Sequence, residues 1–313
     1  MIPSDLPEQK RGEREKGETG MKNSNQIKGH LLALVCVAVW GSSFVISKGL
    51  MEHLLPVQLM LARFILAYGA LWIVCPRWYV NPKEELHFLL MAIFANTLYY
   101  WAENTAITLT QTTNVSILVS TAPIMTALML AAIQKGKVLT RNQTIGFAIA
   151  FLGVVLVVLN GALSLKIQPA GDLLALLAAV SWASYGILLR RWGTGHDDVL
   201  VARKLMFYGI VTGLPLALTA GQPVDFTALL TWKNGISLAY LAFVGNALCY
   251  ICWGGAVRKI GVLSANLYLY MIPLVTLVIS FLALGETITV MGAAGMVLVT
   301  AGMICATMLP EKK

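Results

Sequence analysis

The sequence has 313 residues, of which 58% are hydrophobic and 12% charged, with a formal net charge of +8. A soluble domain carries about 25% charged residues, so this composition excludes a soluble globular enzyme, a disordered protein and a small disulfide-stapled module. A polytopic membrane protein remains. A nucleic-acid partner would require the basic residues to cluster on one face, and they are instead spread along the chain.

The first 29 residues differ from the rest of the chain. The stretch from Glu8 to Glu18 alternates Lys and Arg with Glu and has almost no apolar side chain to bury. Segments of this composition do not gain enough from burial to fold alone. We therefore expect residues 1–29 to form a disordered cytoplasmic tail.

From residue 30 onward the chain is a series of apolar stretches close to the roughly 20 residues that cross a bilayer as a helix. A membrane β-barrel would show shorter strands of alternating polarity. The predicted fold class is thus an all-α integral membrane protein with ten transmembrane helices. The expected spans are 30–50, 57–75, 86–107, 112–133, 142–160, 171–189, 200–220, 236–257, 262–283 and 290–309.

The connecting segments predict the orientation of the spans. Lys and Arg accumulate in cytoplasmic loops, and with the N-terminus inside, the outer loops contain only Lys166 and Lys233. Both termini are then cytoplasmic, as ten spans require. The positive charge is explained as an orientation signal, and the expected partner surface is the lipid bilayer.

The two halves of the chain, 30–160 and 171–309, resemble each other. The matched residues are Trp40 and Trp182, Arg63 and Arg203, Asn96 and Asn246, Tyr100 and Tyr250, and Pro123 and Pro273. Each half has five spans, so the second half must enter the membrane in the opposite orientation. Inverted repeats are typical of secondary transporters, which bind substrate near the midplane between the halves.

Several of these residues resemble the EamA family, the ten-helix branch of the drug/metabolite transporter superfamily. The resemblance rests on W-G-S-S-F-V-I-S-K at 40–48, A-R-F at 62–64, the proline-bearing fourth and ninth spans, and Gly285-Glu286. It implies a bacterial inner-membrane carrier for small metabolites, often an exporter of amino acids or related compounds. Where the family often has an acidic residue after the fourth span, this sequence has Lys137.

Charged residues inside the spans are candidates for function because burying them is costly. Glu103 and Arg63 lie at similar expected depths and could form an ion pair. Glu103 would bind a proton or an amino group, with Arg63 adjusting its pKa or holding a carboxylate. The alternative is a fixed pair that locks the second and third helices together.

Asn96 and Asn246 lie mid-span at matched positions. One interpretation is that they line a central cavity; the other is that they bond helices together. The full set of expected substrate-binding residues is Asn96, Tyr100, Trp101, Glu103, Asn246, Tyr250, Trp253, Tyr268 and Tyr270.

Pro123 and Pro273 each remove a backbone hydrogen bond and bend a helix. Their matched places favour hinges or gates over passive kinks. Gly292, Gly295 and Gly302 permit close packing within the fold or at a homodimer contact.

The sequence predicts no metal and no cofactor. Cys249 and Cys252 form C-x-x-C without a second pair or a histidine, which does not suit zinc. The predicted function is a secondary transporter working by alternating access, with export favoured. The alternatives are an integral-membrane enzyme acting on lipid-like substrates, which would show clustered acid and histidine residues, and a channel.

Overall fold

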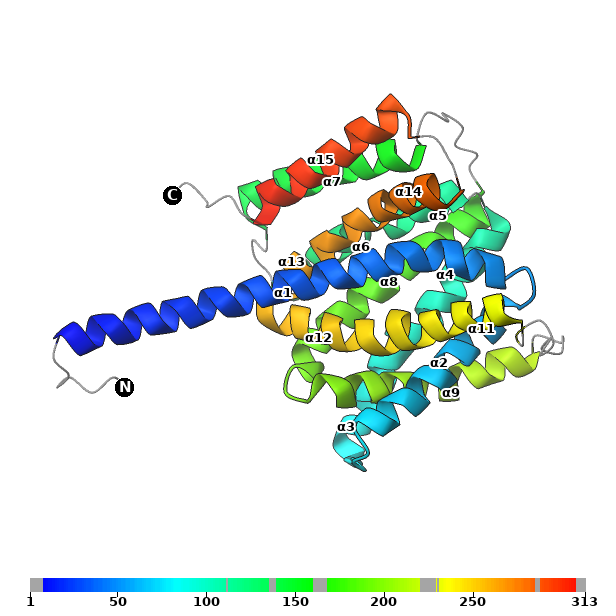
Figure 1. Cartoon of the computed structure of the whole chain (residues 1–313), viewed down its shortest axis with the longest axis horizontal. Helices are drawn as coiled ribbons and strands as arrows, with labels where there is room; N and C mark the ends of the chain where they lie inside the picture. The colour runs from blue at the N-terminus through cyan, green and yellow to red at the C-terminus, as the bar shows by residue number, and fades with distance from the viewer. Residues whose placement is uncertain are drawn as a thin grey trace.

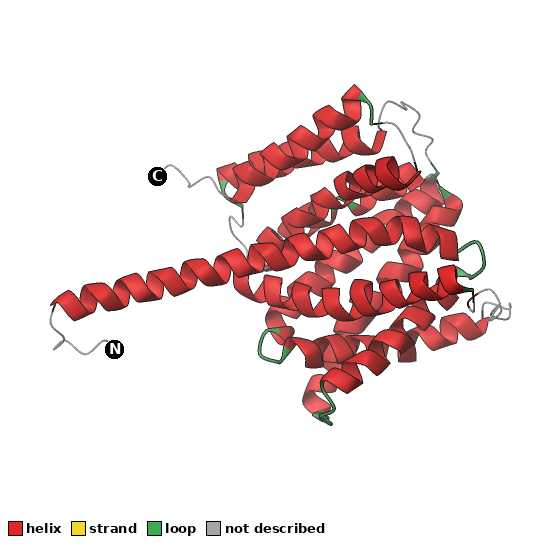
Figure 2. Cartoon of the chain, viewed as in Figure 1, coloured by secondary structure: helices red, strands yellow, loops and turns green. Residues whose placement is uncertain are grey.

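The computed structural model describes residues 8–110, 112–134, 139–159, 168–219, 229, 231–284 and 288–307. All regular structure in these ranges is helical (Figure 2). Among the described residues, eight helical segments are long and apolar enough to cross a membrane, and a shorter apolar helix covers Val290–Ala306. Lys137, Gly285 and Glu286 lie outside the described ranges.

The helices follow one another in two series. The first series comprises α1 (Glu8–Leu50), α2 (Pro56–Val74), α3 (Pro82–Ala92), η1 (Ile93–Leu98), α4 (Tyr99–Leu109), α5 (Thr112–Val119), α6 (Ala122–Gln134) and α7 (Arg141–Leu159). The second comprises α8 (Pro169–Leu188), η2 (Leu189–Gly193), α9 (Asp198–Thr219), α11 (Trp232–Ala239), η3 (Tyr240–Leu248), α12 (Cys249–Ile260), α13 (Val262–Leu267), η4 (Tyr268–Tyr270), α14 (Met271–Leu284) and α15 (Val290–Thr307).

The N-terminal tail differs from its expected disorder. Helix α1 begins at Glu8 and runs without a break to Leu50, so residues 8–29 are helical, and the N-terminal part of the helix projects beyond the bundle (Figure 1). The costly step in helix formation is nucleation. The apolar first span provides that nucleus, and each further residue toward the N-terminus adds one backbone hydrogen bond.

The predicted third and eighth spans share an unusual local structure. Each contains a π-helical segment, η1 in the third and η3 in the eighth, and these segments hold Asn96 and Asn246. π-Helical turns are rare and often occur at functional sites. The helix that runs from Pro82 to Leu109 is not among the eight apolar segments; it carries Glu84, Glu85 and Glu103, which lower its hydropathy.

The predicted fourth and ninth spans are interrupted helices rather than continuous bent ones. A turn at 120–121 separates α5 from α6, and Pro123 is the second residue of α6. In the ninth span, the 3₁₀ segment η4 separates α13 from α14, and Pro273 is the third residue of α14. The first helical turn has no intrahelical N–H bond to lose, so proline is tolerated there. Each proline therefore lies in the first turn of a new helix.

Helices α7 and α15 lie side by side along their length (Figure 1). Glycines make this approach possible: a Cβ atom added at Gly153 would lie 2.6 Å from the backbone nitrogen of Val299 and 2.7 Å from the carbonyl oxygen of Gly295. Gly146 and Gly302 are in equally close contact. The chain thus uses Gly295 and Gly302 for packing within the fold.

The contacts between helices repeat in the two series. Helix α1 packs against α12 and α14, while α8 packs against α4 and α6. Helices α2 and α9 pack against each other, as do α7 and α15. The first helix of each series thus contacts the third and fourth spans of the other series, across the middle of the bundle.

Candidate functional site

A buried arginine joins the two halves of the chain at the centre of the bundle. Helix α2 begins at Pro56, and the side chain of Gln58 closes its first turn by accepting a hydrogen bond from the backbone nitrogen of Leu55. Two turns further on, Arg63 is 5% exposed. Its Nε donates to Oδ1 of Asn246 at 2.8 Å.

Arg63 has a second polar partner in Tyr100 of α4. A terminal nitrogen of the guanidinium donates to the Tyr100 hydroxyl at 3.2 Å, and the guanidinium carbon lies 5.0 Å from the centre of the ring. The ring of Phe64 packs edge-on against Tyr100 at 5.6 Å between centroids. Both side-chain acceptors of this buried cation are therefore neutral.

The two matched asparagines have different roles in the structure. Asn96 donates to the carbonyl oxygen of Leu205 at 2.8 Å and accepts from the Tyr250 hydroxyl at 2.7 Å. Its amide thus bonds three elements together, in line with the helix-bonding interpretation. Asn246 accepts from Arg63, but its Nδ2 is buried without a hydrogen-bond partner.

Glu103 is also 5% exposed, and it accepts a hydrogen bond from the Tyr99 hydroxyl at 2.8 Å. The expected ion pair with Arg63 is not formed: no ion pair between described residues includes either side chain. The reason is directional, because Arg63 reaches across the bundle to Asn246 of η3, while Glu103 turns back to Tyr99 on its own helix.

Three tryptophans lie between these groups. The ring centroids of Trp40 and Trp182 are 5.3 Å apart, those of Trp40 and Trp253 5.1 Å, and those of Trp182 and Trp253 5.8 Å. Trp40 donates from Nε1 to the carbonyl oxygen of Gly245 at 3.0 Å. Trp182 also packs against Tyr99, the partner of Glu103, at 5.3 Å. We call Trp40, Trp182 and Trp253 the tryptophan triad.

Other expected site residues lie apart from this centre. Trp101 is 40% exposed, because it is rotated by about 100° around α4 from Tyr100. It does not share the buried surroundings of Tyr100, and its place in a cavity wall stays a prediction. The Tyr268 hydroxyl and Nδ1 of His30 form a hydrogen bond of 2.8 Å, and the ring of Tyr270 packs against Phe147. Among the described residues, no hydrogen bond joins Tyr268 or Tyr270 to Arg63 or Glu103.

Trp40, Trp182 and Tyr99 belong to this centre but were not predicted as site residues. The match between Trp40 and Trp182 is a signal in the sequence, and it indicated a duplication rather than a site. Asn266 of α13 was also missed; its Nδ2 donates to Oγ1 of Thr126 in α6 at 2.6 Å. That bond joins the two interrupted spans.

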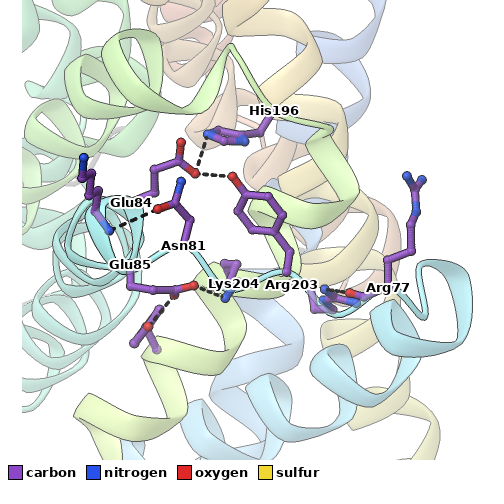
Figure 3. A network of polar contacts seen from close by, with 10 residues as sticks. Arg77, Asn81, Glu84, Glu85, His196, Arg203 and Lys204 are labelled. Carbon is purple, nitrogen blue, oxygen red and sulfur yellow. Dashed lines mark hydrogen bonds and ion pairs between the residues drawn. The ribbon is translucent and has the colours of Figure 1, made fainter.

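A second polar network lies at the end of the bundle where α2 ends and α3 begins (Figure 3). Asn81 caps α3 by accepting from the backbone nitrogen of Lys83, and Pro82 begins the helix. This cap places Glu84 and Glu85 in the first turn, where the helix dipole favours negative charge.

The carboxylates of this network bind groups from the other half of the chain. Lys204 of α9 donates to Glu85 at 2.6 Å, and the Tyr208 hydroxyl donates to its other oxygen at 2.6 Å. Burial raises the pKa of Glu85, but these two donors outweigh it and hold the pKa below its ordinary value. Nε2 of His196 lies 3.7 Å from a carboxylate oxygen of Glu84.

Tyr79 and Arg203 complete the network. The Tyr79 hydroxyl donates to Glu84, which together with burial raises the tyrosine pKa. Arg203 donates to the backbone carbonyl oxygens of Cys75 and Arg77, beyond the end of α2, and its guanidinium lies 4.4 Å from the ring of Trp72. Arg203 thus ties α9 to α2, whereas its sequence match Arg63 lies in the polar centre.

The helices are long enough to span a membrane and surround a buried polar centre. In the described part of the chain, the charged groups lie at that centre or near the helix ends. This arrangement defines a multi-pass helical membrane protein. The model of the EamA-like transporter family matches residues 27–159 and again residues 169–308. The chain belongs to this family. The two matches also correspond to its two helical series.

Relatives of the chain are named as transporters. It is 30% identical to an uncharacterized transporter of Archaeoglobus fulgidus, over 90% of this chain and 97% of that protein. It is also 30% identical to a probable amino-acid metabolite efflux pump of Salmonella typhimurium, over 88% and 93%. A probable terminal-alkyne amino-acid exporter of Streptantibioticus cattleyicolor is 31% identical, over 60% and 62%.

The fold is shared with a solved crystal structure that covers 89% of this chain and 96% of that chain, with a TM-score of 0.73 and 16% sequence identity. The family and the names of the relatives indicate a transporter and not an enzyme. The alternative of a lipid-modifying membrane enzyme is therefore set aside. A transporter of this family works in a membrane on a small-molecule substrate.

Proposed function

We propose that this protein is an inner-membrane secondary carrier that exports an amino acid, an amine or a related metabolite by alternating access. Two relatives, which align with 88% and 60% of the chain, are named as a probable amino-acid metabolite efflux pump and a probable terminal-alkyne amino-acid exporter. The ten proposed spans place both termini in the cytoplasm, with the Lys- and Arg-rich segments on the same side.

The arrangement of the helices supports two inverted repeats of five spans, 30–160 and 171–309. The family matches each half separately. The π-helical segments at Asn96 and Asn246, the interruptions before Pro123 and Pro273, and the exchanged contacts of α1 and α8 recur in both halves. In such carriers the two conformations arise when the halves exchange roles around one site.

The observation that carries the proposal is a pair of buried ionisable groups, Arg63 and Glu103, whose side-chain hydrogen bonds within the described ranges go only to neutral groups. Arg63 bonds to Asn246 and Tyr100, and Glu103 bonds to Tyr99. A buried charge without a counter-charge is costly in a membrane protein and is a functional candidate. A substrate with an amino group, or a proton, would neutralise Glu103, and a substrate carboxylate would neutralise Arg63.

Aromatic and amide side chains would line the path to these charges. Tyr100 and Asn246 bond directly to Arg63, and Tyr250 bonds to Asn96. Trp253 belongs to the tryptophan triad. We propose these residues as the substrate cavity, with Tyr268 and Tyr270 on the ninth span at its margin.

The interrupted spans would act as the gates. Interrupted helices at matched places in two repeats often form substrate sites and moving elements of carriers. The bond from Asn266 to Thr126 joins these two spans across the halves and would break and reform as they move. A homodimer is not needed to bury the glycines of α15, since they pack against α7.

A counterflow screen tests the proposal. The full chain is reconstituted in proteoliposomes loaded with one unlabelled amino acid or amine, and uptake of the same labelled compound is followed. Transient accumulation of an amino acid or amine is expected, without ATP. Accumulation of carboxylates that lack an amino group, with no amino compound carried, would contradict the role given to Glu103.

A further inference from the structure

Five buried side-chain atoms have no hydrogen-bond partner among the described residues, and three of them are N–H donors near the centre of the bundle; the other two are Oδ1 of Asn266 and the hydroxyl of Tyr270. The three donors are Nε1 of Trp182, Nε1 of Trp253 and Nδ2 of Asn246. Trp253 and Asn246 are fully buried, and Trp182 is 6% exposed. Leaving a buried donor unpaired costs free energy, and a cluster of such groups in a native protein calls for a ligand or ordered water.

The three donors belong to one continuous group of side chains. Trp182 and Trp253 pack against each other and against Trp40. Trp40 in turn donates to the carbonyl oxygen of Gly245, the residue before Asn246. A Cβ atom added at Gly245 would lie 3.8 Å from a guanidinium nitrogen of Arg63, so the cation lies beside the same stretch of backbone.

The unpaired polar atoms of this group are all hydrogen-bond donors. An indole nitrogen can only donate, and a guanidinium can only donate. Asn246 already uses its oxygen as the acceptor for Arg63. These donors can therefore bind a negatively charged hydrogen-bond acceptor, and a carboxylate is such a group.

The acidic residue of the centre lies at the matched position of the other half. Glu103 follows Asn96 by seven residues, just as Trp253 follows Asn246 by seven. The duplicated spans thus carry an acceptor at one position and a donor at the other. Tyr99 connects the two sides, because it donates to Glu103 and packs against Trp182. This polarity matches a molecule with an ammonium group at one end and a carboxylate at the other.

We propose that Trp182, Trp253 and Asn246, together with Arg63, bind the carboxylate of the substrate, so that the substrate class is free amino acids and not amines that lack a carboxylate. This inference rests on the proposed transport function. The donor atoms are covered by protein in this structure, so the carboxylate reaches them when the two halves separate during the transport cycle.

The test compares each common amino acid with the amine formed by removing its carboxyl group, such as leucine with isopentylamine and phenylalanine with phenethylamine. Counterflow is measured with the full chain in proteoliposomes for the wild type, Trp182→Phe and Trp253→Phe. Phenylalanine keeps a buried ring and removes the N–H donor. Trp232→Phe is the matched control, because Trp232 is 84% exposed at the start of α11.

The wild type is expected to carry amino acids and to carry their decarboxylated amines weakly or not at all. Loss of one hydrogen bond to a charged group should raise KM for the amino acid roughly tenfold or more in Trp182→Phe and Trp253→Phe. The control should match the wild type. If one triad variant fails to fold, the other and Asn246→Ala provide the same comparison.

Two results overturn the inference while the transport function stands. One is equal transport of amino acids and their decarboxylated amines. The other is an unchanged KM for the amino acid in both triad variants, or the same change for acid and amine, as expected if the donors hold only water. Failure to carry any amino acid or amine would instead contradict the proposed function itself.

Discussion

Arg63 of α2 and Asn246 of η3 are joined across the two halves of the chain by a hydrogen bond of 2.8 Å from Nε to Oδ1. Both side chains are buried. The bond places a permanent positive charge, which forms no ion pair among the described residues, beside the π-helical segment η3.

Replacing Arg63 should separate its structural and transport roles. Arg63→Ala removes the donor to Asn246 and Tyr100, at a cost of about 1–3 kcal/mol for the acceptors left unpaired, and abolishes transport. Arg63→Lys keeps the charge but lacks the planar fork, so it should be more stable than Arg63→Ala and still transport poorly. Thermal unfolding in detergent and counterflow measure the two effects. Wild-type transport by Arg63→Ala would disprove the role.

Glu103 should control proton or amine coupling. Glu103→Gln keeps the size of the side chain and its bond with Tyr99 but cannot ionise, so pH-gradient-dependent transport should be lost. Tyr99→Phe, which keeps the carboxyl and removes its donor, should have a smaller effect. Uptake into vesicles with and without an imposed pH gradient is the measurement. Unchanged pH-dependent uptake in Glu103→Gln would rule out this role.

The Glu85 network predicts how stability depends on pH. The pKa of Glu85 in the folded protein lies below its ordinary value, since Lys204 and Tyr208 outweigh the effect of burial. A lowered folded-state pKa contributes stability that is present above the ordinary carboxyl range and lost as the pH falls through the lowered pKa. Glu85→Gln should therefore reduce the unfolding temperature at neutral pH and lessen its fall in acid.

The comparison for this network is the unfolding temperature of the wild type and Glu85→Gln in one detergent from neutral to acidic pH. The difference between them should shrink as the pH falls. A constant difference across the whole range would mean that the charge of Glu85 adds nothing to stability.

Close packing of α7 against α15 predicts a steric effect at Gly153. A Cβ atom there would lie within 2.6 Å of the backbone of α15, so Gly153→Val should destabilise the protein by about 1–3 kcal/mol or more through overpacking. Gly69→Val is the matched control, because nothing apart from its own stretch of helix lies within 4 Å of an added Cβ. It should be neutral or slightly stabilising. Equal unfolding temperatures for both variants would contradict the packing.

The sequence predicts a structural feature well where a single property of the residues determines that feature. Apolar length located the helices, and matched residues such as Asn96 and Asn246 indicated the duplication, which the double family match supports. The direction in which a side chain points could not be predicted in the same way. Expected depth placed Arg63 and Glu103 at one level, but only the orientation of their helices shows that each bonds to a neutral partner.

Local structure explains the other differences. Trp101 and Tyr100 are adjacent in sequence yet face different sides of α4, which an aromatic run alone does not reveal. The prolines were expected to bend continuous helices, whereas the preceding turns leave them in the first turns of α6 and α14. The contacts of Glu85 with Lys204 and Tyr208 join residues far apart in sequence.

The central claim is that the Arg63–Glu103 centre binds an amino compound in a carrier that alternates between two states. Counterflow of an amino acid identified by the screen tests it most directly. Wild-type proteoliposomes preloaded with unlabelled amino acid should accumulate the labelled form transiently above equilibrium, and Arg63→Ala should not. Uptake that is the same with and without internal amino acid, or that survives Arg63→Ala, would contradict the account.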